Sequence, residues 1–398
     1  MITTTTLSNK KKNGNIMKKQ DNPNIDEAIK RGWEIPDYTM KQLRDAIPSH
    51  CFRRDTFYSL SYVLHDAIFV TILAFSASYI DMVPSVSLRV GLWSIYWVLQ
   101  GIVAMGVWVL GHECGHQAFS PSKTINNSVG LVLHSLLLTP YHSWRISHSR
   151  HHKGTGSMSK DEIYVPLTRS KRGMPSRQRD PEGDGPHGTF EQSPVATLYS
   201  MFSMFVLGWP LYLINNFGGR HYDSISWISH LNPKCDIFNE NHFWEVTESV
   251  GGILSMIGFL GYLCQNLGIM TVIKFYGIPY IFLNFWLVLI TYLHHTHPEV
   301  PHYRDGVWNF QRGASLTIDR SYGKFIDHFH HHISDTHVVH HLFSTIPHYH
   351  AQEATFYLKK AMGKHYQSDN TPIPLAFWQS WTRCYYVEDE GDVVFYKH

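Results

Sequence analysis

Hydrophobic residues along the chain are gathered in long runs that polar segments separate. Four runs come near the ~20 residues that cross a hydrocarbon core as a helix, at about 57–80, 90–110, 250–273 and 276–293. The run at about 128–139 is too short to cross, and the run at about 195–217 is broken by Pro210. We expect these two runs to be in-plane or re-entrant. The pattern therefore predicts an all-α integral membrane protein with four transmembrane helices in two hairpins.

The charged residues orient this arrangement. Residues 1–40 are polar and contain lysine pairs, and the segment 145–179 is rich in lysine and arginine. Because basic loops stay on the cytosolic side of a membrane, we expect both segments there. Four crossings then return the chain to the cytosol. The sequence predicts a disordered cytosolic tail at 1–40, a membrane domain at 41–398, a helical cytosolic cap from 111–249 and 294–398, and two cytosolic termini.

The composition excludes some functions and singles out one residue type. The net charge of +2 removes any general electrostatic attraction to nucleic acid. The five cysteines are odd in number and never spaced as CxxC, which argues against a disulfide framework or a thiolate zinc site and favours a reducing compartment. Histidine is the outlier, with 28 residues.

Three histidine clusters carry the chemistry: His112 and His116; His148, His151 and His152; and His337, His340 and His341. Residues three and four apart share one face of a helix, so each cluster directs its imidazoles the same way. A shuffled chain of this composition would contain the HxxHH pattern only roughly 0.1–0.2 times. The pattern also occurs at 328–332, which we interpret as a solvated or outer helix face.

The number of imidazoles narrows the choice of metal. Neutral imidazole suits several transition metals, but eight convergent rings exceed the three or four protein ligands of a zinc ion. The clusters therefore predict a dinuclear site. Two iron ions can activate dioxygen, which zinc cannot, because zinc has no redox chemistry. In an apolar setting this chemistry indicates oxidation of a lipid.

Several other polar residues are candidates for the same site. The last apolar run ends at a further histidine group, in which we favour His295 as a ninth ligand, with His297 next. Metal-bound imidazoles usually donate their second N–H to an acceptor, and nearby carboxylates could serve. The candidates are Asp161, Asp319 and Asp335. Asp66 and His134 lie in apolar runs, where each could act in function or as a structural partner.

At this point the residues resemble a known family. The segments HECGHQAFSPSK at 112–123, PYHSWRISHSRHHK at 140–153, WNFQRGASLTIDR at 308–320 and DTHVVHHLFSTIPHYHAQEAT at 335–355 are similar to the membrane fatty-acid desaturases. The resemblance is to the acyl-lipid Δ12 and ω-3 branch, and to its fungal members in particular. It covers the chain from about Tyr38 to the end.

The resemblance implies a cytosolic cap that holds two irons above a narrow acyl tunnel. It implies removal of two hydrogens from an acyl chain with O2 and two electrons. The donor would be cytochrome b5 with its NADH-dependent reductase, as separate proteins, in the endoplasmic reticulum membrane; a homo- or hetero-oligomer is allowed. The implied metal ligands are His112, His116, His148, His151, His152, His295, His337, His340 and His341.

The substrate would be an unsaturated C18 acyl chain on a membrane lipid, which receives a cis double bond. Between the Δ12 and ω-3 (Δ15) positions we lean to ω-3, because segments 154–161 and 330–338 resemble the ω-3 enzymes more than the Δ12 enzymes. A hydroxylase, epoxygenase or acetylenase on the same scaffold is the main alternative.

Two more distant alternatives have a different chemistry. The first cluster also matches HExxH, so an intramembrane zinc protease with Glu113 as general base is a rival. It would leave the other clusters unexplained. A lipid-binding or metal-carrying membrane protein without catalysis is the third class.

Overall fold

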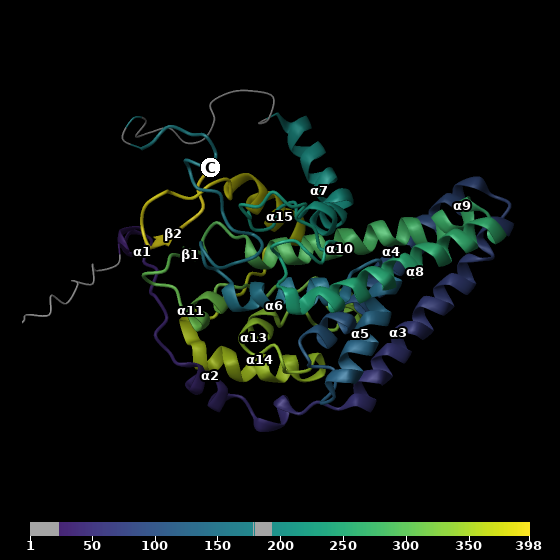
Figure 1. The fold of residues 1–398 in the computed structure, drawn as a ribbon, viewed down its shortest axis with the longest axis horizontal. Coiled ribbons are helices and arrows are strands. Elements are labelled where there is room, and N and C mark those ends of the chain that lie inside the picture. Colours follow the sequence, from purple (N-terminus) through teal and green to yellow (C-terminus); the bar gives the residue numbers. More distant parts are fainter. Residues whose placement is uncertain (1–23, 178, 180–192) are drawn as a thin grey trace, which may run out of the picture.

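The computed structural model describes residues 24–177, 179 and 193–398, and nearly all regular structure in them is helical (Figure 1). The long helices are α3 (Thr56–Ala77), α4 (Val86–Gly115), α7 (Pro194–Asn215), α8 (Phe243–Leu267) and α10 (Ile278–His295). Shorter helices are α1 (Asp26–Lys30), α2 (Met40–Ala46), α5 (Lys123–Leu136), α6 (Tyr141–Gly154), α9 (Ile269–Val272), α11 (Phe310–Ala314), α12 (Lys324–Phe329), α13 (His337–Leu342), α14 (His348–Met362) and α15 (Ile373–Arg383).

Single turns and one small sheet complete the described elements. Strands β1 (His302–Tyr303) and β2 (Val393–Val394) pair antiparallel. The turns are η1 (Ser49–Phe52), η2 (Ile80–Met82), η4 (Glu240–His242), the π-helical η5 (Ile273–Gly277) and η6 (Gly363–His365). The fold therefore depends on helix packing.

Five helical segments in the described part of the chain are long and apolar enough to cross a membrane: Thr56–Met82, Val86–Gly115, Val195–Asn215, Glu240–Leu267 and Ile269–His295. At 1.5 Å per residue, the 30 residues of α4 extend about 45 Å, more than the ~30 Å hydrocarbon core. The carboxyl end of α4 can therefore project out of the apolar layer. Helix α8 starts earlier than the apolar run at 250–273 predicts, and it ends at Leu267, before Gly268, whose φ of +84° breaks the helix.

The long helices form an extended bundle, and the short helices gather at one end of it. In Figure 1 the bundle of α3, α4, α8 and α10 reaches to the right as far as α9, while α2, α6, α11, α13 and α14 lie at the left. Helix α4 packs against α3, α5 and α10, and α7 packs on α10. The short run at 128–139 falls largely in α5, whose 14 residues span only about 21 Å.

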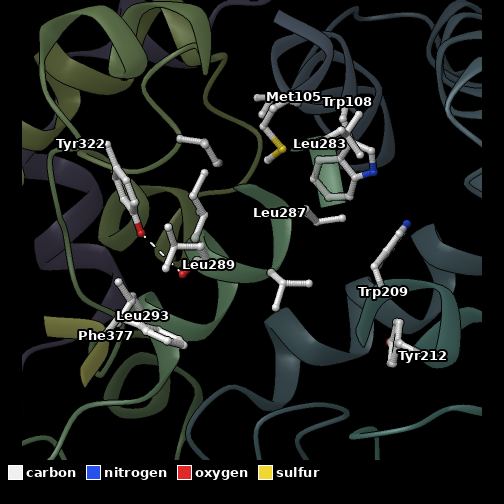
Figure 2. Close-up of a cluster of buried hydrophobic side chains, with 14 of the residues drawn as sticks. Met105, Trp108, Trp209, Tyr212, Leu283, Leu287, Leu289, Leu293, Tyr322 and Phe377 are labelled. Atoms are coloured by element: carbon white, nitrogen blue, oxygen red, sulfur yellow. Dashed lines mark hydrogen bonds between the residues drawn. The ribbon is translucent and has the colours of Figure 1, made fainter. Parts of the chain in front are cut away.

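The largest hydrophobic core lies where the bundle meets the short helices (Figure 2). Met105 and Trp108 of α4 face Leu283 and Leu287 of α10, and Trp209 of α7 lies beside them. Burial of this apolar surface holds α7 and α15 against the bundle. It also fixes the ends of α4 and α10.

The predicted disordered tail is ordered from residue 24 onward. Ala28 in α1 is 1% exposed and packs with Val393 and Phe395 near the carboxyl terminus. The indole Nε1 of Trp33 donates to the Tyr303 hydroxyl at 2.9 Å. Apolar residues scattered among the polar ones thus anchor this segment, and the prediction of disorder is wrong for 24–40. Residues 1–23 lie outside the described residues.

Candidate metal centre

The first histidine pair lies at the carboxyl end of α4. His112 is in the last turn and His116 is the residue that caps the helix, so both rings point to the same side. Glycines on this helix permit close approach of its neighbours. A Cβ at Gly111 would lie 2.2 Å from the His134 ring, and one at Gly115 would lie 2.9 Å from the Trp144 ring. The α4 end is therefore in direct contact with α5 and α6.

The other two clusters lie on short buried helices. His148, His151 and His152 are on α6, and the third cluster occupies three of the six positions of α13. An aspartate from another segment supports α13: the Asp319 carboxylate accepts the backbone N–H of Val338 at 2.8 Å. Tyr366 donates its hydroxyl to the same carboxylate. The first backbone N–H groups of a helix have no partner within the helix, and the Asp319 carboxylate accepts one of them in α13.

The structure brings all nine predicted histidines together in two groups. The first group contains His112, His116, His148, His152 and His340, whose ligand atoms lie within 4.8 Å of one another. The Nε2 atom of His148 is 3.1 Å from that of His112 and 3.0 Å from that of His152. A neutral imidazole has only one N–H, so these facing nitrogens cannot all be satisfied by hydrogen bonds to each other.

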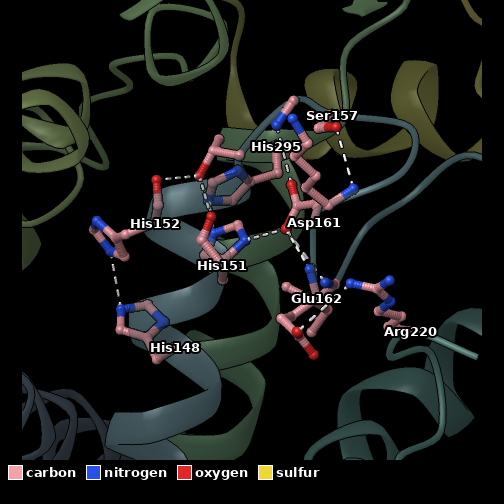
Figure 3. A network of polar contacts seen from close by, with 12 residues as sticks. His148, His151, His152, Ser157, Asp161, Glu162, Arg220 and His295 are labelled. Atoms are coloured by element: carbon pink, nitrogen blue, oxygen red, sulfur yellow. Dashed lines mark hydrogen bonds and ion pairs between the residues drawn. The ribbon is translucent and has the colours of Figure 1, made fainter. Parts of the chain in front are cut away.

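The second group contains His151, His295 and His341, again within 4.8 Å of one another. His337 joins this group, since its Nε2 is 3.1 Å from the Nε2 of His295. The Nε2 atoms of His151 and His295 are 3.3 Å apart. His151 and His152 also link the two groups, because they are neighbours on α6 (Figure 3).

Three of the four rings in the second group are held from outside by hydrogen bonds that their Nδ1 atoms donate. His151 Nδ1 donates to Asp161 at 2.6 Å, as Figure 3 shows, and His341 Nδ1 donates to the Thr155 hydroxyl at 3.1 Å. His337 Nδ1 donates to the Ile333 carbonyl at 3.3 Å. With the proton fixed on Nδ1, the inward Nε2 keeps its lone pair, which is the form that binds a metal ion.

The first group is held mainly by aromatic stacking. The Trp144 ring stacks on His148 with centroids 4.3 Å apart, and Trp108 stacks on His112 at 5.6 Å. The Nδ1 atoms of His112 and His152 are buried without a hydrogen-bond partner. The Glu113 carboxylate lies 3.6 Å from His112 Nδ1, too far for a hydrogen bond.

Burial keeps these imidazoles neutral. Desolvation, and then the neighbouring histidines, hold the pKa of His148, His152, His340 and His341 well below the ordinary value. Burial likewise lowers the pKa of His116 to about 3. These five histidines therefore offer uncharged nitrogen donors at neutral pH, and both groups contain some of them. Such a donor set fits two transition-metal ions.

The other sequence candidates have different surroundings. Asp161 contacts a ring of the second group, but Asp319 supports the backbone of α13, and burial raises its pKa to about 7. Asp335 pairs with His332, at 3.1 Å. The Nε2 atom of His297 lies 3.4 Å from the Oδ2 atom of Asp369, and His297 belongs to neither group.

Two further interpretations are refined by the structure. In the cluster at 328–332, His328 is exposed whereas His330 and His331 are buried, so only part of the cluster is a solvated face. His331 donates to Asp66 of α3 at 2.8 Å, so Asp66 is a partner between elements. His134 donates to the Trp108 carbonyl at 3.1 Å and thus joins α5 to α4.

Sequence reasoning missed Thr155, Trp144 and Ile333 as supports of the imidazoles. Only Trp144 had a signal, since it lies four residues before His148 on α6, whereas Thr155 contacts His341, 186 residues away. The carbonyl of Ile333 carries no signal, because every residue has one.

An apolar cavity of about 240 Å³ reaches the histidines from the bundle side. Its wall combines core side chains with imidazoles, among them Met105, Trp209, Leu287, His148, His295 and His337. Figure 2 shows some of its apolar lining residues, among them Met105, Trp209 and Leu287. The arrangement can hold an apolar chain against the nitrogen donors.

Comparison with known proteins agrees with this geometry. The model of the fatty acid desaturase family matches residues 91–372, and one described as a domain of unknown function matches residues 2–75. A Delta(12) fatty acid desaturase of Mortierella isabellina is 50% identical over 374 residues, 93% of each chain. Its namesake from Mortierella alpina is 49% identical over the same share. The omega-6 fatty acid desaturase, endoplasmic reticulum isozyme 1, of Glycine max is 42% identical over 89% of this chain and 88% of its own.

These matches cover most of the chain, including all nine clustered histidines and the helices that carry them. The chain belongs to the fatty acid desaturase family and is a membrane oxidoreductase that acts on fatty acyl lipids.

Proposed function

We propose that the chain is a Δ12 acyl-lipid desaturase, which introduces a cis double bond into a monounsaturated C18 chain of a membrane lipid. The observation that carries this proposal is the apolar cavity that ends on the two imidazole groups. The position of the double bond is proposed from the relatives, which are named Delta(12) or omega-6 desaturases. The lean to ω-3 finds no support among these names, and we set it aside.

The nine clustered histidines are the proposed ligands of two iron ions, with Asp161, Thr155 and the Ile333 carbonyl as the groups that orient the second set. Iron bound there supplies dioxygen activation for removal of two hydrogens. The apolar wall holds the acyl chain and excludes water beside the imidazoles. We propose O2 as oxidant, and cytochrome b5 with its NADH-dependent reductase as a separate electron source.

A topology with four crossings is part of the proposal. Two contacts join the tips of the hairpins: Lys274 pairs with Asp81 at 2.7 Å, and the Trp97 indole donates to the Lys274 carbonyl at 2.9 Å. Both tips thus meet at the end of the bundle away from His112 and His295. Helix α7 packs near the histidine end through Trp209, which supports an interfacial position for it.

This topology puts both histidine groups and both termini in the cytosol, in the endoplasmic reticulum membrane. The test uses a Cys264→Ser, Cys384→Ser background, which removes both partly exposed cysteines, with one new cysteine at Lys364 or Asn266, both exposed. An impermeant thiol reagent added to sealed microsomes should label the first and spare the second until detergent is added. Labelling of both, or only of the second, would contradict the topology.

The activity is tested by expression in a yeast that makes only monounsaturated fatty acids. New 18:2 without feeding is the expected result, and 18:3 that appears only after linoleate is fed would instead identify an ω-3 enzyme. Hydroxy, epoxy or acetylenic products would identify the alternative chemistries. A His340→Ala variant at equal protein level is the control for background products.

A further inference from the structure

A second group of metal-binding side chains lies away from the nine histidines. His50 and Cys51 belong to the η1 turn before α3, and Glu353 lies on α14. One ligand atom from each of the three lies within 4.8 Å of the others. None of these residues belongs to the two histidine groups, and neither the family reaction nor the acyl cavity uses them.

Two of the distances among these ligand atoms lie near those expected around a tetrahedral ion. His50 Nε2 is 2.9 Å from Glu353 Oε2 and 3.8 Å from Cys51 Sγ. Around a tetrahedral zinc ion, bond lengths near 2.0 and 2.3 Å put nitrogen and oxygen about 3.3 Å apart, and nitrogen and sulfur about 3.5 Å apart. The observed separations differ from these by a few tenths of an ångström.

A further donor and a route for the ion are present. His350 lies three residues before Glu353 on the same face of α14, and its ring centroid is 5.7 Å from that of His50. The side chains of His50 and Glu353 are 48% and 44% exposed, while Cys51 is buried beneath them. An ion can therefore reach the imidazole and the carboxylate directly from solvent.

We propose that His50, Cys51 and Glu353, with His350 as the fourth donor, form a zinc site that fastens the η1 segment to α14. Sulfur, imidazole and carboxylate together are a donor set that zinc accepts. The site would hold the chain before α3 against the helix that follows the third histidine cluster. Its role is structural, and it does not rest on the proposed function.

Without a metal these groups would make a weak contact. An exposed ion pair between His50 and Glu353 contributes little to stability. Burial, and then the Glu353 carboxylate, raise the pKa of the Cys51 thiol to about 11, so it is not a reactive thiolate at neutral pH. Metal binding would have to displace that proton, and zinc affinity should therefore fall as the pH is lowered.

The test uses the full chain purified in detergent, with iron and zinc measured per chain. We expect about one zinc beyond the iron, and with Co²⁺ added in its place a thiolate-to-cobalt absorption band. We expect zinc affinity to fall at least about tenfold both in Glu353→Gln, which changes a surface side chain, and in Cys51→Ser. Cys51→Ser should also abolish the cobalt band. Cys264→Ser is the matched control and should change neither.

Each outcome decides the proposal. If Cys51→Ser fails to fold, Glu353→Gln alone carries the test, since its side chain is exposed. Absence of zinc in the wild type under zinc supplementation, or unchanged zinc affinity in Glu353→Gln, would overturn the site. Iron content should stay the same in both variants, so loss of the zinc site is distinguishable from failure of the desaturase assignment.

Discussion

The two histidine groups consist of the same side chain but are supported in different ways. In the second group, hydrogen bonds from outside fix His151, His337 and His341 through Nδ1. In the first group, tryptophan rings stack on His112 and His148, and the Nδ1 of His112 has no partner. Hydrogen bonds set both the orientation of a ring and the position of its proton, whereas stacking sets only the orientation. The two sets should therefore respond differently to the same kind of mutation.

Removal of one imidazole from each group should give the largest effect. His295→Ala leaves three rings in the second group, and His340→Ala leaves four in the first. Both should lose activity by more than about 100-fold, because a direct ligand matters more than an outer hydrogen bond. His295→Ala should also lose more iron. Product analysis in yeast and iron per purified chain measure the two quantities. Equal iron loss would contradict the difference in ligand number.

Acid should destabilise both groups together. The pKa values of His148, His152, His340 and His341 are lowered in the folded protein, while the unfolded chain titrates near the ordinary ~6.5. Below that pH the unfolded state binds more protons, so the free energy of unfolding falls by up to about 1.4 kcal/mol per pH unit for each such histidine. Well above pH ~6.5 the contribution of these histidines to the free energy of unfolding no longer changes with pH. Asp319 acts in the opposite direction, since its pKa is raised.

The measurement is the thermal midpoint of the iron-free protein in detergent at pH 5.5, 6.5 and 7.5. We expect little change between the upper two values and a clear fall at the lowest. A midpoint that is independent of pH would mean that the imidazoles are already protonated or lie open to water.

Asp161→Asn tests the hydrogen-bonded group specifically. The substitution removes the charge that holds the Nδ1 proton of His151, so activity or iron affinity should fall roughly 10- to 100-fold. Asp335→Asn is the matched control, because Asp335 pairs with His332 outside both groups. If both variants behaved alike, the contact with His151 would have no special role.

Part of this site could be predicted from the sequence alone. The spacing of His148, His151 and His152 on one helix and the placement of His295 at the end of an apolar run follow from periodicities that sequence displays. The long helices follow from the same kind of pattern. These features are local, and each depends on residues within a few turns of one another.

The rest depends on contacts between distant segments. Asp319 supports α13 although 19 residues separate it from Val338, and Asp66 reaches His331 across 265 positions. The buried Ala28 near the amino terminus is explained by Phe395 at the other end of the chain. Pairs that are so distant in sequence leave no periodic pattern. The sequence therefore predicts a disordered tail, and it selects the aspartates as acceptors for the imidazoles only because they lie near histidines in the chain.

Trp144→Phe tests the stacked group and should have a moderate effect. A smaller ring keeps part of the contact with His148, so at most the energy of one aromatic pair is lost. We expect activity to fall about 2- to 10-fold. Trp378→Phe, at an exposed position on α15, is the control. A loss as large as that of Asp161→Asn would show that stacking and hydrogen bonding support the imidazoles equally.

Glu113→Gln should have the smallest effect. The Glu113 carboxylate accepts the backbone N–H of His348 at 3.0 Å, and a glutamine oxygen can accept the same bond. Its other oxygen is 3.6 Å from His112 Nδ1, so no strong hydrogen bond to the first group is lost. The desaturation rate should fall by less than about threefold, because the substitution weakens one hydrogen bond without removing it. A protease with Glu113 as general base would lose nearly all turnover instead. Near-complete loss in this variant, with iron retained, would show that the first group depends on the carboxylate rather than on the tryptophan rings, and the contrast between the two groups would disappear.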